Sequence, residues 1–325
     1  MNAKILIILT GGTIAMKTAP QLGIVPTSEF ADFLRSFPQL KDVADVDVME
    51  YSNIPSPYMT PQMMFDLAKT IDRQILEYDG VVCTHGTDTV EETAFLCDLV
   101  LTTRKPVVFT AAMRSGSDLG LDGPRNIIGS VRVASNPESY DKGVLVVMND
   151  EIHTARDVTK TDTGKVDAFQ SLGYGPLGYV DPDRIVYHRS TLYRENVWTD
   201  KLDTNIDLIK ACAGMDGRYI HCSIAHGTKG IVIEAFGRGN LPSYLVPDII
   251  TAIQNKIVVV ICTRAYTGRV LDEYGYEGGG RHLQSTGAIS GGDLRGIKAR
   301  LKLMALFGKY HDPNEVRKFF AGSMQ

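Results

Sequence analysis

Short apolar runs that alternate with helical patterns are the feature that most constrains the fold of this chain. The strand-length apolar runs of the first half are residues 5–9, 80–83, 105–110 and 143–148. Between them lie apolar residues at helical spacing, for example Met63, Leu67 and Ile71. Strands that alternate with helices are typical of a mostly parallel sheet with helices on both faces.

The second half of the chain repeats this alternation. Its expected strands are residues 218–222, 230–234 and 257–262, and a last helix is expected at about 294–307. Residues 181–205 are polar and irregular, and 325 residues exceed what one core usually holds. We therefore expect a two-domain α/β fold. Residues 1–190 form a larger N-terminal domain with a mostly parallel sheet flanked by helices, 191–207 a linker, and 208–325 a smaller C-terminal α/β domain.

Composition limits the partners and the compartment. The formal net charge is −4 and no basic stripe is visible, which argues against nucleic acid as a partner. The 5 cysteines include no Cys-x-x-Cys pair, so neither a disulfide framework nor a zinc site is indicated. No apolar run reaches the roughly 18 residues of a membrane span, and the first strand leaves no room for a signal peptide. We expect a cytoplasmic protein that does not bind membranes.

Two strand ends carry hydroxyl groups beside glycine. Residues 10–15 read Thr-Gly-Gly-Thr-Ile-Ala after the first apolar run, and residues 84–89 read Thr-His-Gly-Thr-Asp-Thr after the second. Glycine permits sharp bends and close approach of another group to the backbone. Ligands bind at the carboxyl ends of strands in open α/β sheets, although an ordinary tight turn explains either motif taken alone.

A lysine segment adds a cation to these hydroxyls. Residues 156–161 read Arg-Asp-Val-Thr-Lys-Thr and follow the strand that ends near Met148. A lysine is most often a solvated surface residue. If Lys160 is instead partly buried beside Thr87, burial favours its neutral form, which accepts a proton as a base does. Hydroxyl, amine and carboxylate would then supply a nucleophile, a base and an orienting group.

These motifs, taken together and in this order, resemble the bacterial-type L-asparaginases, the family shared with the glutaminase-asparaginases. The resemblance continues through 91–94, 112–114, 122–124, 144–150, 174–179 and 237–240, so it covers nearly the whole chain. It implies an amidohydrolase that converts L-asparagine to L-aspartate and ammonia. It also implies no metal or organic cofactor, a small amino-acid substrate, and a homodimer or homotetramer.

The resemblance also implies roles for single residues. Thr13 matches the family's nucleophile, Thr87 and Lys160 match the pair that positions or activates a nucleophile, and Asp88 and Ser56 match the groups that hold the substrate's amino group and carboxylate. With the candidates discussed next, the expected catalytic residues are Thr13, Thr87, Asp88, Lys160, Tyr274 and Tyr276. The expected substrate-binding residues are Gly12, Ser56, Pro57, Gly86, Thr87, Asp88, Ala112 and Arg238.

The chain departs from the family's pattern near the nucleophile. Residues 16–27 lack periodicity and are expected to form a loop over the strand end, but they contain no tyrosine where many members carry one. We hypothesise that Tyr274 or Tyr276 replaces it, with Tyr58 as a second candidate, although all three tyrosines are equally well explained as structural. Pro57 removes one backbone donor to the substrate.

Arg238 stands where some members have asparagine, and it is suited either to a carboxylate or to an interface ion pair. These departures leave open glutamine, D-asparagine or a substituted β-amide as substrate. They also leave open a non-catalytic amino-acid-binding protein of the same fold. Dinucleotide binding is disfavoured because Gly-x-Gly-x-x-Gly is absent after the first strand. An archaeal-type transamidase subunit is disfavoured because the first motif begins within the first 15 residues.

Overall fold

The chain divides into two units, Met1–Asn196 and Val197–Gln325. The computed structural model describes residues 2–12, 14, 16–19, 23–26, 34, 38–191 and 194–322. None of the helices in this described part has the length and apolar character needed to span a bilayer. The predicted boundaries 1–190, 191–207 and 208–325 remain a proposal.

The first unit contains most of the strands. They are β1 (Lys4–Gly11), β2 (Met16–Ala19), β3 (Gly23–Pro26), β4 (Asp45–Ile54), β5 (Gly80–Thr84), β6 (Val107–Thr110), β7 (Val144–Met148), β8 (Glu151–Thr154), β9 (Thr159–Lys160), β10 (Phe169–Gln170), β11 (Gly178–Val180) and β12 (Ile185–Tyr187). The helices are α2 (Pro38–Val43), α3 (Pro61–Gln74), α4 (Val90–Val100) and α5 (Gly123–Ser135), with 3₁₀ turns η2 (Ser56–Tyr58), η3 (Ile75–Glu77) and η4 (Pro137–Ser139).

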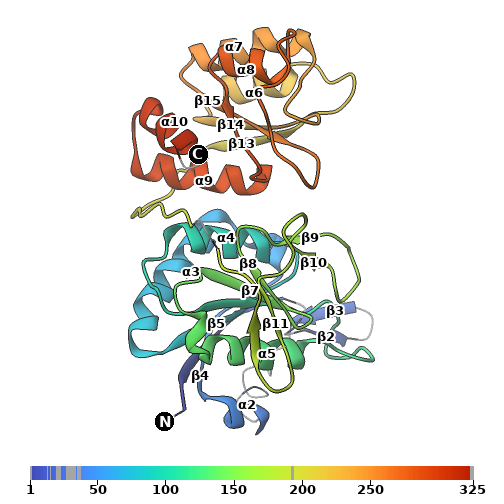
Figure 1. Ribbon diagram of the computed structural model, residues 1–325, viewed down its shortest axis with the longest axis vertical. Coiled ribbons are helices and arrows are strands. Elements are labelled where there is room, and N and C mark those ends of the chain that lie inside the picture. Colours follow the sequence, from blue (N-terminus) through green and yellow to red (C-terminus); the bar gives the residue numbers. More distant parts are fainter. Residues whose placement is uncertain are drawn as a thin grey trace. The chain divides into compact units, whose positions relative to one another are not determined.

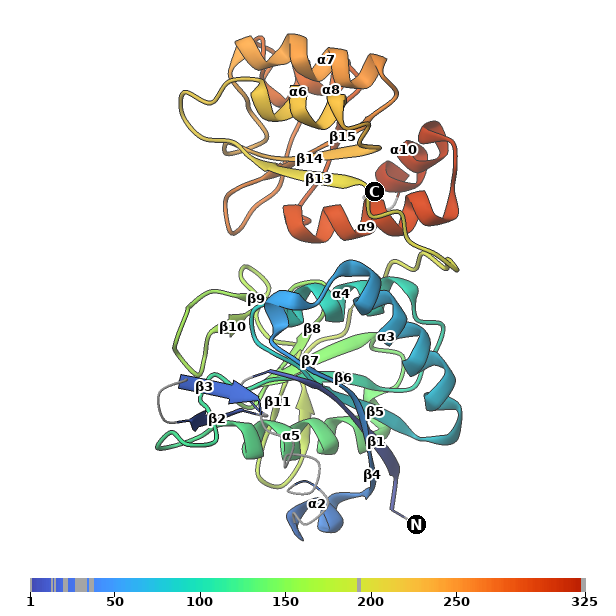
Figure 2. The same cartoon turned by 180° about the vertical axis from the view of Figure 1, so that it is seen from behind.

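Eight strands of this unit form one sheet in the order β12-β11-β8-β7-β6-β5-β1-β4. The strands from β4 to β7 pair in parallel, and β8, β11 and β12 extend the sheet in antiparallel fashion. Helices α3 and α4 cover one face and α2 and α5 the other (Figures 1 and 2). Burial on both faces explains why the central strands are apolar throughout rather than alternating, as in Ile5–Leu9.

The second unit is a smaller α/β layer structure. Its elements are β13 (Ile206–Lys210), α6 (Arg218–Ala225), β14 (Gly230–Ala235), η5 (Ser243–Leu245), α7 (Val246–Gln254), β15 (Val258–Thr263), α8 (Gly280–Ser285), β16 (Ile289–Ser290), α9 (Gly296–Lys309) and α10 (Pro313–Gly322). The four strands pair in parallel in chain order. Helices α6, α7 and α8 lie on one face and α9 and α10 on the other (Figures 1 and 2). The predicted α/β fold class is therefore confirmed.

Two local predictions are wrong. Residues 218–222, expected to be a strand, begin helix α6, in which Ile220 and Ser223 are buried three residues apart as on one helical face. The aromatic and β-branched residues Tyr219 and Ile220 favour strands, but packing decides the outcome. The expected loop at 16–27 contains the antiparallel pair β2–β3. Strands of four residues are too short to show a clear period in the sequence.

Candidate active site

The predicted site residues of the first unit follow four neighbouring strands. Ser56 follows β4, Gly12 follows β1, Gly86 follows β5 and Ala112 follows β6, and these strands are adjacent in the sheet. All four strands run in parallel, so their carboxyl ends meet at one edge. This is the edge where ligands bind in open α/β sheets.

Two glycine turns at this edge are in direct contact. A Cβ atom added to Gly12 would lie 2.3 Å from the Cα atom of Gly86, and one added to Gly86 would lie 2.5 Å from the Ser56 Oγ atom. Gly12 also has a φ of +86°, a conformation that L residues with a side chain rarely adopt. The glycines are therefore required by close packing, and they bring the turns after β1 and β5 against Ser56.

Ser56 joins the turn after β4 to the turn after β5. Its side chain is 5% exposed, and its Oγ accepts a hydrogen bond from the Asp88 backbone N–H at 3.2 Å. Its carbonyl oxygen accepts from the Thr89 hydroxyl at 2.8 Å. The neighbouring Pro57 is exposed, and Tyr58, proposed as an alternative activating group, is 70% exposed.

Lys160 reaches both Thr87 and Asp88. Its Nζ donates to Thr87 Oγ1 at 2.9 Å and forms an ion pair with Asp88 Oδ1 at 2.8 Å. The lysine side chain is 18% exposed and the aspartate side chain 57%, whereas Thr87 is buried. Lysine, hydroxyl and carboxylate from segments 73 residues apart thus meet at one point. This arrangement can move a proton at the hydroxyl and bind a cationic group at the exposed carboxylate.

His85 has a structural contact that sequence reasoning left without a role. Its Nδ1 lies 2.8 Å from the Gly86 carbonyl oxygen, and its Nε2 lies 3.0 Å from Thr93 Oγ1. Complete burial lowers the pKa of His85 to about 4, so the ring is neutral at neutral pH. These partners assign the proton to Nδ1, because a carbonyl oxygen can only accept. The neutral ring therefore holds the Gly86 carbonyl in place next to Thr87.

Three predicted residues belong to the second unit. Arg238 forms an ion pair with Glu273 at 3.2 Å, and its carbonyl oxygen accepts from the Leu271 backbone N–H. The rings of Tyr274 and Tyr276 lie 5.7 Å apart between centroids, and the two side chains are 40% and 55% exposed. The unit thus gathers Arg238 and both tyrosines in one loop region.

The predicted nucleophile Thr13 lies outside the described residues. Gly12 and Ile14, its neighbours in the chain, are both buried. Ile14 approaches Gly123, where an added Cβ would lie 3.0 Å from Ile14 Cγ1 and 3.5 Å from Ala112 Cβ. Ala112 is fully buried, so its side chain packs inside the protein beside Gly123 rather than facing solvent.

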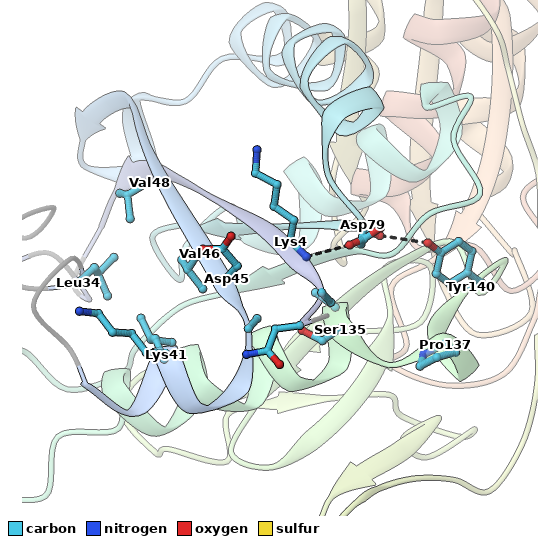
Figure 3. Close-up of a pocket in the computed structure, with 15 residues that line it drawn as sticks. Lys4, Leu34, Lys41, Asp45, Val46, Val48, Asp79, Ser135, Pro137 and Tyr140 are labelled. Atoms are coloured by element: carbon cyan, nitrogen blue, oxygen red, sulfur yellow. Dashed lines mark hydrogen bonds between the residues drawn. The ribbon is translucent and has the colours of Figure 1, made fainter.

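A cavity of about 1100 Å³ lies at the opposite edge of the sheet (Figure 3). It is lined by residues at the amino ends of strands, among them Lys4, Asp45 and Asp79. The backbone N–H of Lys4 donates to Asp79 Oδ2 at 2.8 Å. None of the predicted site residues lines this cavity. Within the described part of the chain, no group of three or more His, Cys, Asp or Glu side chains is arranged to hold a metal ion.

Comparison with known proteins identifies the family. Residues 4–193 match the family model described as "Asparaginase, N-terminal", and residues 205–320 match "Glutaminase/Asparaginase C-terminal domain". An L-asparaginase of Bacillus licheniformis is 34% identical over 96% of this chain and 98% of its own length. A probable L-asparaginase of Deinococcus radiodurans is 37% identical over 98% and 97%.

A solved structure agrees with this relationship. The crystal structure of a probable cytoplasmic L-asparaginase from Campylobacter jejuni matches with a TM-score of 0.87 and 32% identity, covering 98% of this chain and 99% of that one. The resemblance inferred from the motifs is thus confirmed, and this chain belongs to the bacterial-type asparaginase family.

Proposed function

We propose that this protein is an L-asparaginase, which hydrolyses the side-chain amide of L-asparagine to L-aspartate and ammonia. Family membership over nearly the full length supports the reaction class. The observation that carries the proposal is the contact of Lys160 Nζ with both Thr87 Oγ1 and Asp88 Oδ1 at the carboxyl edge of the sheet. The hydrolysis of an amide needs an activated hydroxyl or water and a group that orients the substrate, and this contact offers both.

The proposed nucleophile is the hydroxyl of Thr13. It attacks the carbon of the side-chain amide, and the tetrahedral intermediate collapses with loss of ammonia to leave an ester on the threonine. Water then attacks the ester carbon, which releases aspartate and restores the hydroxyl. The support for this assignment is the motif at 10–15 and the position of Gly12 against Gly86. Backbone N–H groups of such turns are suited to stabilise the oxyanion.

Thr87 and Lys160 are proposed to activate the attacking hydroxyl or water. Lys160 Nζ donates to Thr87 Oγ1 across the 2.9 Å contact; once the ammonium has released a proton to water, the amine accepts the Thr87 proton and Thr87 accepts the proton of the nucleophile. The same groups return the proton to the leaving ammonia. A hydroxyl without such a base is a poor nucleophile, which is why the pair is needed.

Asp88 and Ser56 are proposed to hold the amino-acid part of the substrate. Lys160 occupies Oδ1 of Asp88, whereas Oδ2 receives no bond from the residues that the structure describes, so it is available to the substrate's ammonium group. The Ser56 Oγ accepts from the Asp88 N–H and keeps its own proton to donate to the substrate carboxylate. Gly12, Gly86 and Ala112 shape the same edge. Pro57 follows Ser56 without adding an N–H donor.

The replacement for the missing loop tyrosine is proposed to be Tyr274 or Tyr276, with Tyr58 as the alternative. Arg238 is proposed to be a further substrate-binding residue. The clustering of Arg238 with the two tyrosines supports treating them as one functional loop. We also propose a homodimer or homotetramer in the cytoplasm, where the 5 free cysteines would stay reduced.

The test is ammonia release from L-asparagine, L-glutamine, D-asparagine and succinamate. We expect L-asparagine to be the best substrate, Thr13→Ala to be inactive, and Lys160→Met to lose about a thousandfold in kcat, as is usual when a general base is removed. Lys165→Met is the matched control, because Lys165 is exposed and pairs with Asp162. Activity retained by Thr13→Ala would refute the nucleophile, and binding of asparagine without turnover by the native protein would instead indicate an amino-acid-binding protein.

A further inference from the structure

Glu91 is a buried carboxylate to which the proposed reaction gives no role. It lies in the first turn of α4 and is 7% exposed. Its Oε1 accepts a hydrogen bond from the Lys160 backbone N–H at 3.3 Å. Its Oε2 is buried and has no hydrogen-bond partner among the described residues. Each such group in a native protein calls for an explanation beyond packing.

Lys160 is not itself paired within the main sheet. Lys160 is the last residue of β9, which pairs with β10 in a separate two-stranded ribbon and not with the eight-stranded sheet (Figure 2). The turn that carries Thr87 and Asp88, in contrast, follows β5 in the middle of that sheet. The distance from the lysine to its partners therefore depends on contacts between the ribbon and this turn as well as on the short link from β8 to β9.

Three such contacts join Lys160 to one five-residue segment. Its Nζ contacts Thr87 and Asp88, and its backbone N–H contacts Glu91. The side-chain contacts alone constrain the Lys160 backbone only weakly, because a lysine side chain has several rotatable bonds. The Glu91 bond fixes the other end of that side chain. The lysine is thus held at both ends relative to the residues on which it acts.

Stability alone does not account for a carboxylate at this position. Burial of a carboxylate with one oxygen unpaired destabilises the folded state, and the positive end of the α4 dipole offsets only part of that cost. An apolar side chain of similar size would avoid this desolvation cost, although it would leave the Lys160 backbone N–H without its acceptor. The carboxylate is better explained by what its Oε1 does for Lys160.

We propose that Glu91 is a positioning residue for Lys160, which holds the lysine backbone so that the amine reaches Thr87 and Asp88. This inference rests on the catalytic role proposed for Lys160. The hydrogen bond of Glu91 goes to the lysine backbone and not to the amine that contacts Thr87 and Asp88. Its removal should therefore lower kcat through misplacement of the amine and leave substrate binding largely intact.

The test compares Glu91→Leu, which removes the acceptor, with Glu91→Gln, which keeps an oxygen acceptor without the charge. We expect kcat of the leucine variant to fall by about tenfold to a hundredfold with KM changed less than about threefold, as for small misplacements of a catalytic group. The glutamine variant should stay within about threefold of the native kcat. Glu92→Gln is the matched control, since it removes one charge from the same helical turn and should retain native kcat.

Hydrogen exchange at the Lys160 amide gives a readout that does not depend on activity. In Glu91→Leu this amide should exchange at least about tenfold faster than in the Glu92→Gln control, because it loses its acceptor. Unchanged exchange, or a kcat equal to that of the control, would overturn the proposal. If the leucine variant does not fold, Glu91→Ala takes the same two measurements. If Lys160→Met keeps native activity, the catalytic role proposed for Lys160 is wrong, but the faster amide exchange in Glu91→Leu would still be expected. The failure of the proposed function and the failure of the positioning role are therefore distinguishable.

Discussion

Lowering the pH from 7.5 to 5.0 should destabilise the protein through His85 in particular. Burial lowers the pKa of this imidazole to about 4, whereas an unfolded histidine titrates near 6.5. Between about pH 6.5 and about pH 4 this histidine is protonated in the unfolded chain and neutral in the folded chain. The stability contributed by the neutral ring is therefore complete above about pH 7 and is lost as the pH falls from 6.5 towards 4.

The magnitude follows from the two pKa values. At pH 5.0 protonation favours the unfolded chain over the folded one by a factor of about 30, which corresponds to about 2 kcal/mol at 1.36 kcal/mol per tenfold. Carboxylates also titrate in this range, so the effect must be isolated by difference. His85→Gln keeps a donor for the Gly86 carbonyl and removes the titrating ring.

Urea unfolding at pH 7.5 and 5.0, at one protein concentration, measures this difference. Between the two pH values the native protein should lose about 2 kcal/mol more of its unfolding free energy than His85→Gln does. His226→Gln, which alters an exposed histidine, should behave like the native protein. Equal losses in the native protein and His85→Gln, or a ring that takes up its proton near pH 6.5 in nuclear magnetic resonance of the folded state, would refute the argument from burial.

Two further predictions concern packing. Gly86→Ala would bring a methyl group to 2.5 Å from Ser56 Oγ, so we expect a loss of about 1–3 kcal/mol in unfolding free energy and a raised KM. Gly164→Ala is the control, because nothing lies within 4 Å of its added methyl, and it should change stability by less than about 0.5 kcal/mol. Equal effects of the two substitutions in urea unfolding and kinetics would contradict this prediction. Burial raises the pKa of the Cys83, Cys97 and Cys262 thiols. A disulfide reagent should therefore modify only the exposed Cys212 and Cys222 in the native protein, and all 5 cysteines after unfolding. If a variant with both Cys212→Ser and Cys222→Ser still reacts rapidly when folded, burial does not protect the three buried thiols.

The strand ends were predictable because their signals are local. An apolar run that meets glycine and threonine marks the carboxyl end of a buried strand within a few residues, and this located Gly12, Gly86 and Thr87. The meeting of Lys160 with Thr87 and Asp88 was a conditional expectation from the residues and an implication of the family resemblance. The fold then brings these side chains within hydrogen-bond distance.

The parts that sequence reasoning missed depend on contacts between distant segments. The Glu91 bond to the Lys160 backbone joins residues 69 positions apart. Almost every residue type has a backbone N–H, so the identity of residue 160 does not indicate this bond. The helical state of Arg218–Ala225 depends on which residues pack inward, and strand-forming residue types conceal it. The sequence places His85 in a polar motif but does not indicate its complete burial, on which its structural role depends.

The contact between Gly12 and Gly86 has a consequence for how the site tolerates change. Adjacent strands in a sheet are held about 4.8 Å apart by their backbone hydrogen bonds. Because a Cβ added to Gly12 would meet backbone atoms of His85 and Gly86, the separation of these two turns follows the spacing of the paired strands β1 and β5. A carbon added at Gly12 would therefore have to push the two strand ends apart, whereas one added at Gly86 would press on the side chain of Ser56.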